Sequence, residues 1–60
     1  MTNREVEITA NVLNVRSAPG LSNPVINSLR KGAKVVLTET KDGWGKCDKG
    51  WISLEYVKEV

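Results

Sequence analysis

The sequence has little of what stabilises or equips many small proteins. Its 60 residues include no histidine and no phenylalanine, and the single cysteine is Cys47. One thiol cannot form a disulfide within the chain, and without histidine it cannot complete a zinc site. We therefore expect no disulfide framework, no metal and no other cofactor. Cys47 is interpreted as a small buried hydrophobe, because a reactive thiol needs a base that this chain does not supply.

Long apolar runs are also missing. No stretch approaches the ~18 apolar residues of a membrane-spanning helix. Residues 1–10 have no apolar region of the kind found in signal peptides. We therefore expect no membrane insertion, and a targeting signal outside this sequence if the protein is secreted. The first three residues, Met1-Thr2-Asn3, are interpreted as a short linker.

A strong charge of one sign is absent too. Nine Lys and Arg stand against seven Asp and Glu, for a net charge of +2. The local basic cluster is Arg30, Lys31 and Lys34, which we interpret as solvated surface. Nucleic-acid-binding domains of this size usually carry a denser basic stripe. We therefore expect no nucleic-acid partner.

The length of the chain limits both its architecture and its chemistry. We expect residues 1–60 to form one domain of a larger multidomain protein, with a core from 5 to 60. Such a domain buries only about 60% of its unfolded surface, so the aromatic residues Trp44, Trp51 and Tyr56 are candidates for its core. The seven acids fall at strand flanks and turn tips, and no glycine cluster precedes a helix. We expect no catalytic residue and no enzymatic activity.

The dominant hydrophobic period is two, which is typical of half-buried strands. The strongest strand candidate covers residues 34–40, and residues 54–56 are expected to form one helical turn. Lys41-Asp42-Gly43 and Asp48-Lys49-Gly50 predict two hairpin turns, whereas the prolines and glycine of residues 17–24 predict an irregular loop. The pattern predicts an all-β fold, a small partly open barrel of five to six short antiparallel strands.

Several short motifs follow one another in a fixed order. They are Leu13-Asn14-Val15-Arg16-Ser17, Lys31-Gly32, Gly43-Trp44, Gly50-Trp51-Ile52 and Tyr56-Val57. In this order and spacing they resemble the bacterial SH3 domains associated with cell walls, over about residues 10–57. The resemblance implies an SH3-like barrel that serves as an accessory module of a secreted cell-wall hydrolase, endolysin or surface protein.

The function implied by this resemblance is non-catalytic binding or targeting to the cell wall. The implied partners are a stem or cross-bridge peptide of peptidoglycan and a neighbouring catalytic domain of the same chain, and the implied location is extracellular or in the cell wall. One alternative is a structural domain that packs against its neighbour without a small ligand. A proline-rich-peptide binder is a weaker alternative, because the chain has only three aromatic residues and no acidic run in its long loop.

The candidate ligand-binding residues lie on two strands, the long loop and the helical turn. They are Trp44, Tyr56, Asn14, Arg16, Ser17 and Asn23. Asn14 and Arg16 alternate with apolar residues and should point away from the core. They would either contact a polar ligand or hold the loop backbone by hydrogen bonds.

The roles of the aromatic residues stay open at this point. Trp44 would either line a groove or close one end of the barrel. The Tyr56 hydroxyl would reach a ligand or a backbone carbonyl, and Trp51 is interpreted as a core residue. Gly45 departs from the family pattern, in which a sizeable side chain commonly follows the tryptophan. We expect this glycine, and the short turn after Cys47, to remove surface from the binding groove.

Overall fold

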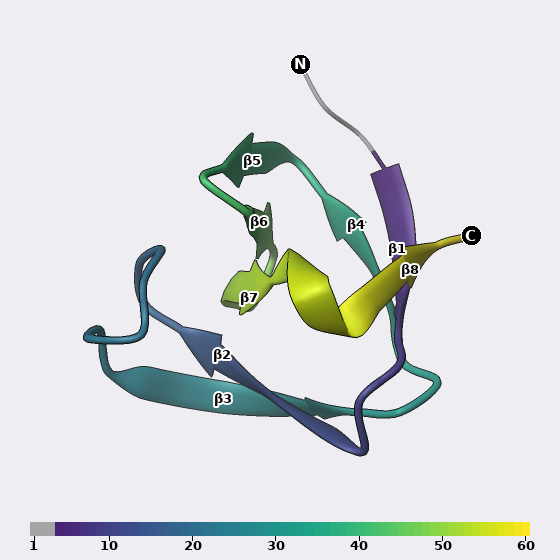
Figure 1. Ribbon diagram of the computed structural model, residues 1–60, viewed down its shortest axis with the longest axis horizontal. Helices are drawn as coiled ribbons and strands as arrows, with labels where there is room; N and C mark the ends of the chain where they lie inside the picture. Colours follow the sequence, from purple (N-terminus) through teal and green to yellow (C-terminus); the bar gives the residue numbers. More distant parts are fainter. Residues whose placement is uncertain (1–3) are drawn as a thin grey trace.

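The computed structural model describes residues 4–60, which form eight short β-strands and one 3₁₀ turn (Figure 1). In chain order these are β1 (Arg4–Ile8), β2 (Val12–Arg16), β3 (Val25–Arg30), β4 (Lys34–Leu37), β5 (Glu39–Lys41), β6 (Trp44–Cys47), β7 (Gly50–Ser53), η1 (Leu54–Tyr56) and β8 (Val57–Glu59). The predicted all-β fold is confirmed, with more strands than the five to six expected. The segment Met1-Thr2-Asn3, interpreted above as a linker, lies outside the described residues.

The strands form two antiparallel sheets. One has the order β4-β1-β8 and the other the order β3-β2-β7-β6-β5. Thr38 divides the predicted strand over residues 34–40 between them, since β4 pairs with β1 and β5 pairs with β6. The backbone N–H of Thr38 donates to the carbonyl of Lys46 at 2.9 Å, where the chain passes from one sheet to the other. The continuous run of strand-forming residues hides this bend in the sequence.

The hydrophobic core draws on both sheets and is aliphatic. Its members, all less than a tenth exposed, are Val6, Ile8, Leu13, Val15, Leu29, Val35, Leu37, Cys47 and Ile52. Cys47 is therefore buried, as predicted. Trp44 and Trp51 are only half-buried, and Tyr56 is exposed. None of the three aromatic candidates is therefore among the buried core residues.

The alternation along β7 explains the position of Trp51. Ile52 is fully buried, whereas Trp51 lies on the opposite face of the strand and is half-buried. The register pairs Ile52 with the buried Gly45, and Trp51 with the exposed Lys46. The interpretation of Trp51 as a core residue is wrong, because two adjacent strand residues cannot both point inward.

Gly45 faces the core rather than the solvent. A Cβ atom at this position would lie 2.8 Å from both terminal methyls of Leu37 and 2.9 Å from a methyl of Leu54. A side chain at position 45 would therefore enter the barrel interior and would not stand in a surface groove. The expectation that Gly45 removes stacking surface from a groove is wrong, since the glycine instead makes room for two leucines.

Tight turns set the register of the larger sheet. Asp42 and Gly43 have φ of 51° and 82°, as a type I′ hairpin turn requires. The pairing of Cys47 with Gly50 leaves only Asp48 and Lys49 between β6 and β7. Both predicted hairpin turns are confirmed, and the second is as short as expected.

The predicted helical turn is also confirmed, as η1. The Ser53 Oγ accepts a hydrogen bond from the Glu55 N–H at 3.4 Å at its start. The N–H of Leu54 donates to the Gly43 carbonyl at 2.9 Å, which ties η1 to the β5–β6 turn. Within residues 4–60 the structure contains no helix of the length and apolarity needed to cross a membrane.

Candidate ligand-binding groove

Three neighbouring hollows on the surface all include the side chain of Trp44. Two of them also share Leu21, Ser53 and Tyr56, so they form one continuous depression. We call the three hollows together the Trp44 groove. Its principal residues are Asn14, Arg16, Leu21, Asp42, Trp44, Ser53, Glu55 and Tyr56. It is open to solvent, so it offers a binding surface rather than an enclosed chamber.

The centre of the groove is built by two turns that are held together. Trp44 is the first residue of β6, directly after the Asp42-Gly43 turn, and Ser53 lies opposite it in β7. Tyr56 is supplied by η1, which the hydrogen bond from Leu54 to Gly43 fixes beside this turn. The half-buried Trp44 and the exposed Tyr56 therefore present aromatic surface in a position set by backbone hydrogen bonds.

Strand β2 supplies the polar side of the groove. Leu13 and Val15 are buried, whereas Asn14 is exposed and Arg16 half-buried. The prediction that Asn14 and Arg16 point away from the core is confirmed. Both line the hollow that contains Trp44 and Tyr56.

Arg16 also supports the long loop. Its Nη1 donates to the carbonyl of Asn23 at 2.7 Å. The Asn23 side chain in turn donates through Nδ2 to the carbonyls of Ala18, Pro19 and Gly20, at 3.2, 2.9 and 3.3 Å. These hydrogen bonds fold residues 17–24 into a compact shape beside the sheet.

Four of the six candidate residues therefore meet in the groove, namely Asn14, Arg16, Trp44 and Tyr56. Ser17 and Asn23 are not among its lining residues. The Ser17 N–H donates to the Pro24 carbonyl at 3.1 Å and closes the base of the loop. Asn23 has its amide nitrogen directed into the loop, so both residues shape the loop that borders the groove.

Sequence reasoning missed several residues of the groove. Leu21, which is 77% exposed, projects from the loop into two of the hollows. Its signal in the sequence is a single large apolar residue within a loop of small and polar ones. Ser53 could have been found by counting across the two-residue turn from Trp44. Asp42 and Glu55 belong to the groove only because two turns meet, which no local pattern shows.

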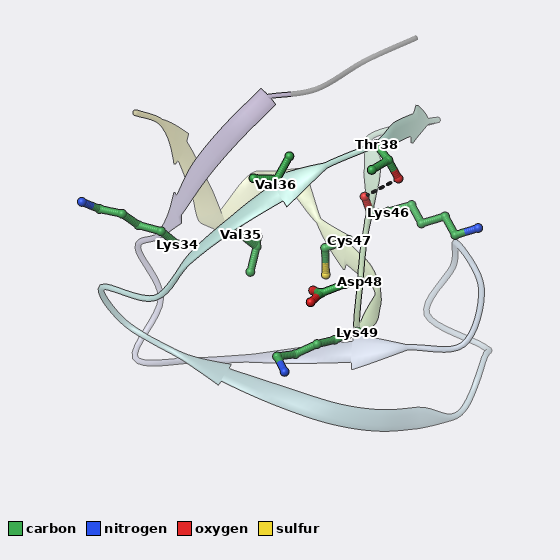
Figure 2. Close-up of a pocket in the computed structure, with 8 residues that line it drawn as sticks. All are labelled: Lys34, Val35, Val36, Thr38, Lys46, Cys47, Asp48 and Lys49. Atoms are coloured by element: carbon green, nitrogen blue, oxygen red, sulfur yellow. Dashed lines mark hydrogen bonds between the residues drawn. The ribbon is translucent and has the colours of Figure 1, made fainter.

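A separate hollow lies between β4 and β6 (Figure 2). Figure 2 shows Val35 and Cys47 pointing into it, while Lys34 and Lys46 point away on opposite sides. The floor of this hollow is thus an edge of the core, and its basic side chains do not converge on one point. Among the described residues, no group of three or more metal-ligating side chains is gathered anywhere.

The fold and the groove together define a small antiparallel β-barrel with a shallow aromatic groove on its surface. Comparison with known families is specific about which barrel this is. Residues 11–58 match the family described as the bacterial SH3 domain. The match covers most of the chain, which therefore belongs to the bacterial SH3 domain family. The resemblance noted in the sequence and the SH3-like fold it implied are confirmed.

Curated proteins with similar sequences are much longer than this chain. It is 39% identical over 54 residues to the probable endopeptidase p60 of Listeria seeligeri. The aligned residues cover 88% of this chain and 10% of that protein. It is 44% identical over 45 residues to the β-N-acetylglucosaminidase of Bacillus subtilis (strain 168). This alignment covers 73% of this chain and 5% of that protein. The chain thus spans a tenth or less of these relatives. No solved structure gives a significant match.

Proposed function

We propose that this domain is a non-catalytic module that binds the peptide part of peptidoglycan and holds a hydrolase at the cell wall. The observation that carries the proposal is the meeting of Trp44, Tyr56, Asn14 and Arg16 in one groove. The names of the relatives, an endopeptidase and a β-N-acetylglucosaminidase, fit enzymes that cut the peptide and glycan parts of such a polymer.

The chemistry of the groove suits a short peptide. Aromatic rings offer flat apolar surface to peptide backbone and methyl groups. The Asn14 amide can both donate and accept hydrogen bonds, and the Arg16 guanidinium can donate to a carboxylate. The groove is shallow, so the affinity of one domain should be low.

The proposal places residues 1–60 as one domain of a larger multidomain protein. That protein would act outside the cell or in its wall, and a catalytic domain of the same chain would be the second partner. Hydrolysis would belong to that domain, because the groove supplies contacts for binding. Neither nucleic acid nor a membrane enters this proposal.

The test is an NMR titration of the labelled domain with soluble wall fragments, stem peptides in one series and glycan chains in another. We expect stem peptides to shift the signals of Trp44, Tyr56 and the long loop, and Trp44→Ala to abolish these shifts. The matched control is Trp51→Ala, which removes a half-buried tryptophan outside the groove. The proposal is wrong if stem peptides cause no shifts and the domain does not sediment with purified walls.

A second candidate function is packing against a neighbouring domain of the same chain. It is favoured by exposed apolar side chains on the edge strand β3, namely Val25 and Ile26, which are 49% and 55% exposed. Such a surface would be covered in the longer protein. The test compares amide spectra of the domain alone and joined to its neighbour, where the shifts would lie on β3 and not at Trp44.

A further inference from the structure

The two ends of the Trp44 groove carry opposite charge. In one hollow Arg16 is the sole charged lining residue, beside Asn14. In the adjoining hollow the charged lining residues are Asp42 and Glu55. Trp44 and Tyr56 belong to both hollows, so two aromatic rings lie between a cationic end and an anionic end.

The anionic end is held in place by backbone contacts. Asp42 sits in the β5–β6 turn and Glu55 in η1, and the hydrogen bond from the Leu54 N–H to the Gly43 carbonyl joins these two elements. Both acids are exposed, and neither forms an ion pair within the part of the chain that the structure describes. Lys41 lines the third hollow together with Asp42 and Trp44, but it forms no ion pair with Asp42.

Two carboxylates beside two aromatic rings form a surface suited to a primary ammonium group. The rings attract a cation to their faces, and the carboxylates accept its hydrogen bonds. At the other end Arg16 has five N–H donors, of which the bond to Asn23 uses one. The remaining donors can bind a carboxylate, so the groove is complementary to a peptide with separated opposite charges.

We propose that the Trp44 groove selects peptides that carry a free amine, with the ammonium between Asp42 and Glu55 and a carboxylate at Arg16. This inference rests on the proposed function, because it specifies the ligand of the same groove. An amide cross-link turns the amine of a stem peptide into a neutral group that the anionic end does not attract. The domain would therefore direct its parent protein to stem peptides that have not been cross-linked.

The experiment uses the synthetic stem tetrapeptide L-alanyl-γ-D-glutamyl-L-lysyl-D-alanine and the labelled domain. Three acetylated forms, blocked at the N-terminus, at the lysine side chain or at both, identify the amine that binds. Blocking that amine should weaken binding about tenfold, the size expected for the loss of a cation–π contact and two solvent-screened charge contacts. Blocking the other amine should change binding by less than about twofold, because that amine would make no charge contact in the groove.

The variants test the two acids directly. Asp42→Asn combined with Glu55→Gln should weaken binding of the free peptide about tenfold, and then acetylation should make no further difference. Asparagine tolerates the φ of position 42, so the turn should persist. The matched control, Asp48→Asn with Glu39→Gln, changes the same charges outside the groove and should bind as the unmodified domain does.

The possible outcomes separate the two proposals. Equal binding of the free and the doubly acetylated peptides would overturn the selection for amines and leave peptide binding in place. Failure of every peptide to bind would overturn both. A loss of affinity in the control variant equal to that in the groove variant would also overturn the inference, because net charge rather than position would then explain it.

Discussion

At the scale of single residues, the absence of a side chain at position 45 allows the core to pack. Gly45 is buried on β6, and the space above its Cα is filled by Leu37 and Leu54. Leu37 is 1% exposed and cannot move aside without disturbing the core. The residue therefore matters for stability, and the groove on the other face of β6 depends on it only through the fold.

Replacement of Gly45 by alanine should destabilise the domain by about 2 kcal/mol, the usual cost of overpacking a filled core. Urea unfolding followed by tryptophan fluorescence measures this change. Lys46→Ala on the exposed side of the same strand is the control and should cost little. A Gly45→Ala domain as stable as the unmodified one would show that the two leucines repack freely.

Asn23 is a second residue whose side chain acts within the structure. Its Nδ2 donates to three loop carbonyls. Asn23→Ala should leave the carbonyls of Ala18 and Pro19 without this donor, while the Gly20 carbonyl keeps the backbone N–H of residue 23, and should cost about 1 kcal/mol. Hydrogen exchange of the loop amides should accelerate at the same time. Asn27→Ala, in which the lost amide oxygen accepts only from the adjacent Ser28 N–H, is the control. Unchanged exchange in the Asn23 variant would contradict this role.

At the scale of elements, the close approach of β7 to β2 depends on Gly50. This residue has φ of 141°, and a Cβ atom would lie 2.7 Å from the Arg16 carbonyl oxygen and 2.8 Å from a methyl of Val15. Gly43 also has positive φ, but a Cβ atom there would meet nothing within 4 Å. Substitutions at these two glycines can therefore be compared to separate the stability lost to backbone strain from the stability lost to steric collision.

Gly50→Ala should therefore cost about 3 kcal/mol or more, from strain and from collision with backbone. Gly43→Ala should cost about 1 kcal/mol, from strain alone. A domain of this size has a total stability of only about 3–9 kcal/mol, so Gly50→Ala should remove about a third of it or more, and Gly43→Ala clearly less. Urea unfolding followed by circular dichroism measures both losses. Similar stabilities for both variants would show that β2 and β7 can separate without loss.

The strands and turns were easier to predict from the sequence than the residues of each strand that face the core. Alternation and the Asp42-Gly43 turn were sufficient to place strands and hairpins, because these signals are local. The inward residue of β7 was misassigned because Trp51 and Ile52 are both apolar, so the alternation gives no sign there. Only pairing with β6 decides it, since Ile52 lies opposite the buried Gly45.

The groove was predictable to the extent that its residues lie near recognisable motifs. Trp44, Tyr56 and Asn14 could be found in this way. Asp42 and Glu55 could not, because the turns that carry them are brought together by the hydrogen bond from Leu54 to Gly43, eleven positions apart along the chain. Contacts of this kind depend on the closed barrel and leave no local pattern.

At the scale of the whole molecule, the domain is small and flattened, with extents of 28 × 28 × 17 Å. One shallow groove on such a body should bind weakly. Linked copies that reach neighbouring sites of a polymer bind with an effective concentration set by the linker. The proposed attachment to a repetitive wall would therefore depend on the number of copies more than on the affinity of one.

Two copies joined by a flexible linker should bind purified walls about a hundredfold more tightly than one copy. Sedimentation with walls at increasing protein concentration measures this gain. A linked pair with Trp44→Ala in one copy is the control and should behave as a single domain. Equal binding by one copy and by the intact pair would show that the sites on the wall are too far apart to be bridged.

The pairing of the first and last strands has a mechanical consequence. Val6 lies opposite Glu59, so the start of β1 is beside the end of β8, and the ion pair of Arg4 with Glu59 closes that side of the sheet. A pulling force applied through both ends would load the β1–β8 hydrogen bonds one after another, as in the opening of a zipper. The domain should yield at low force and lengthen, and a protein stretched between a wall and a second domain would thereby gain an extensible joint.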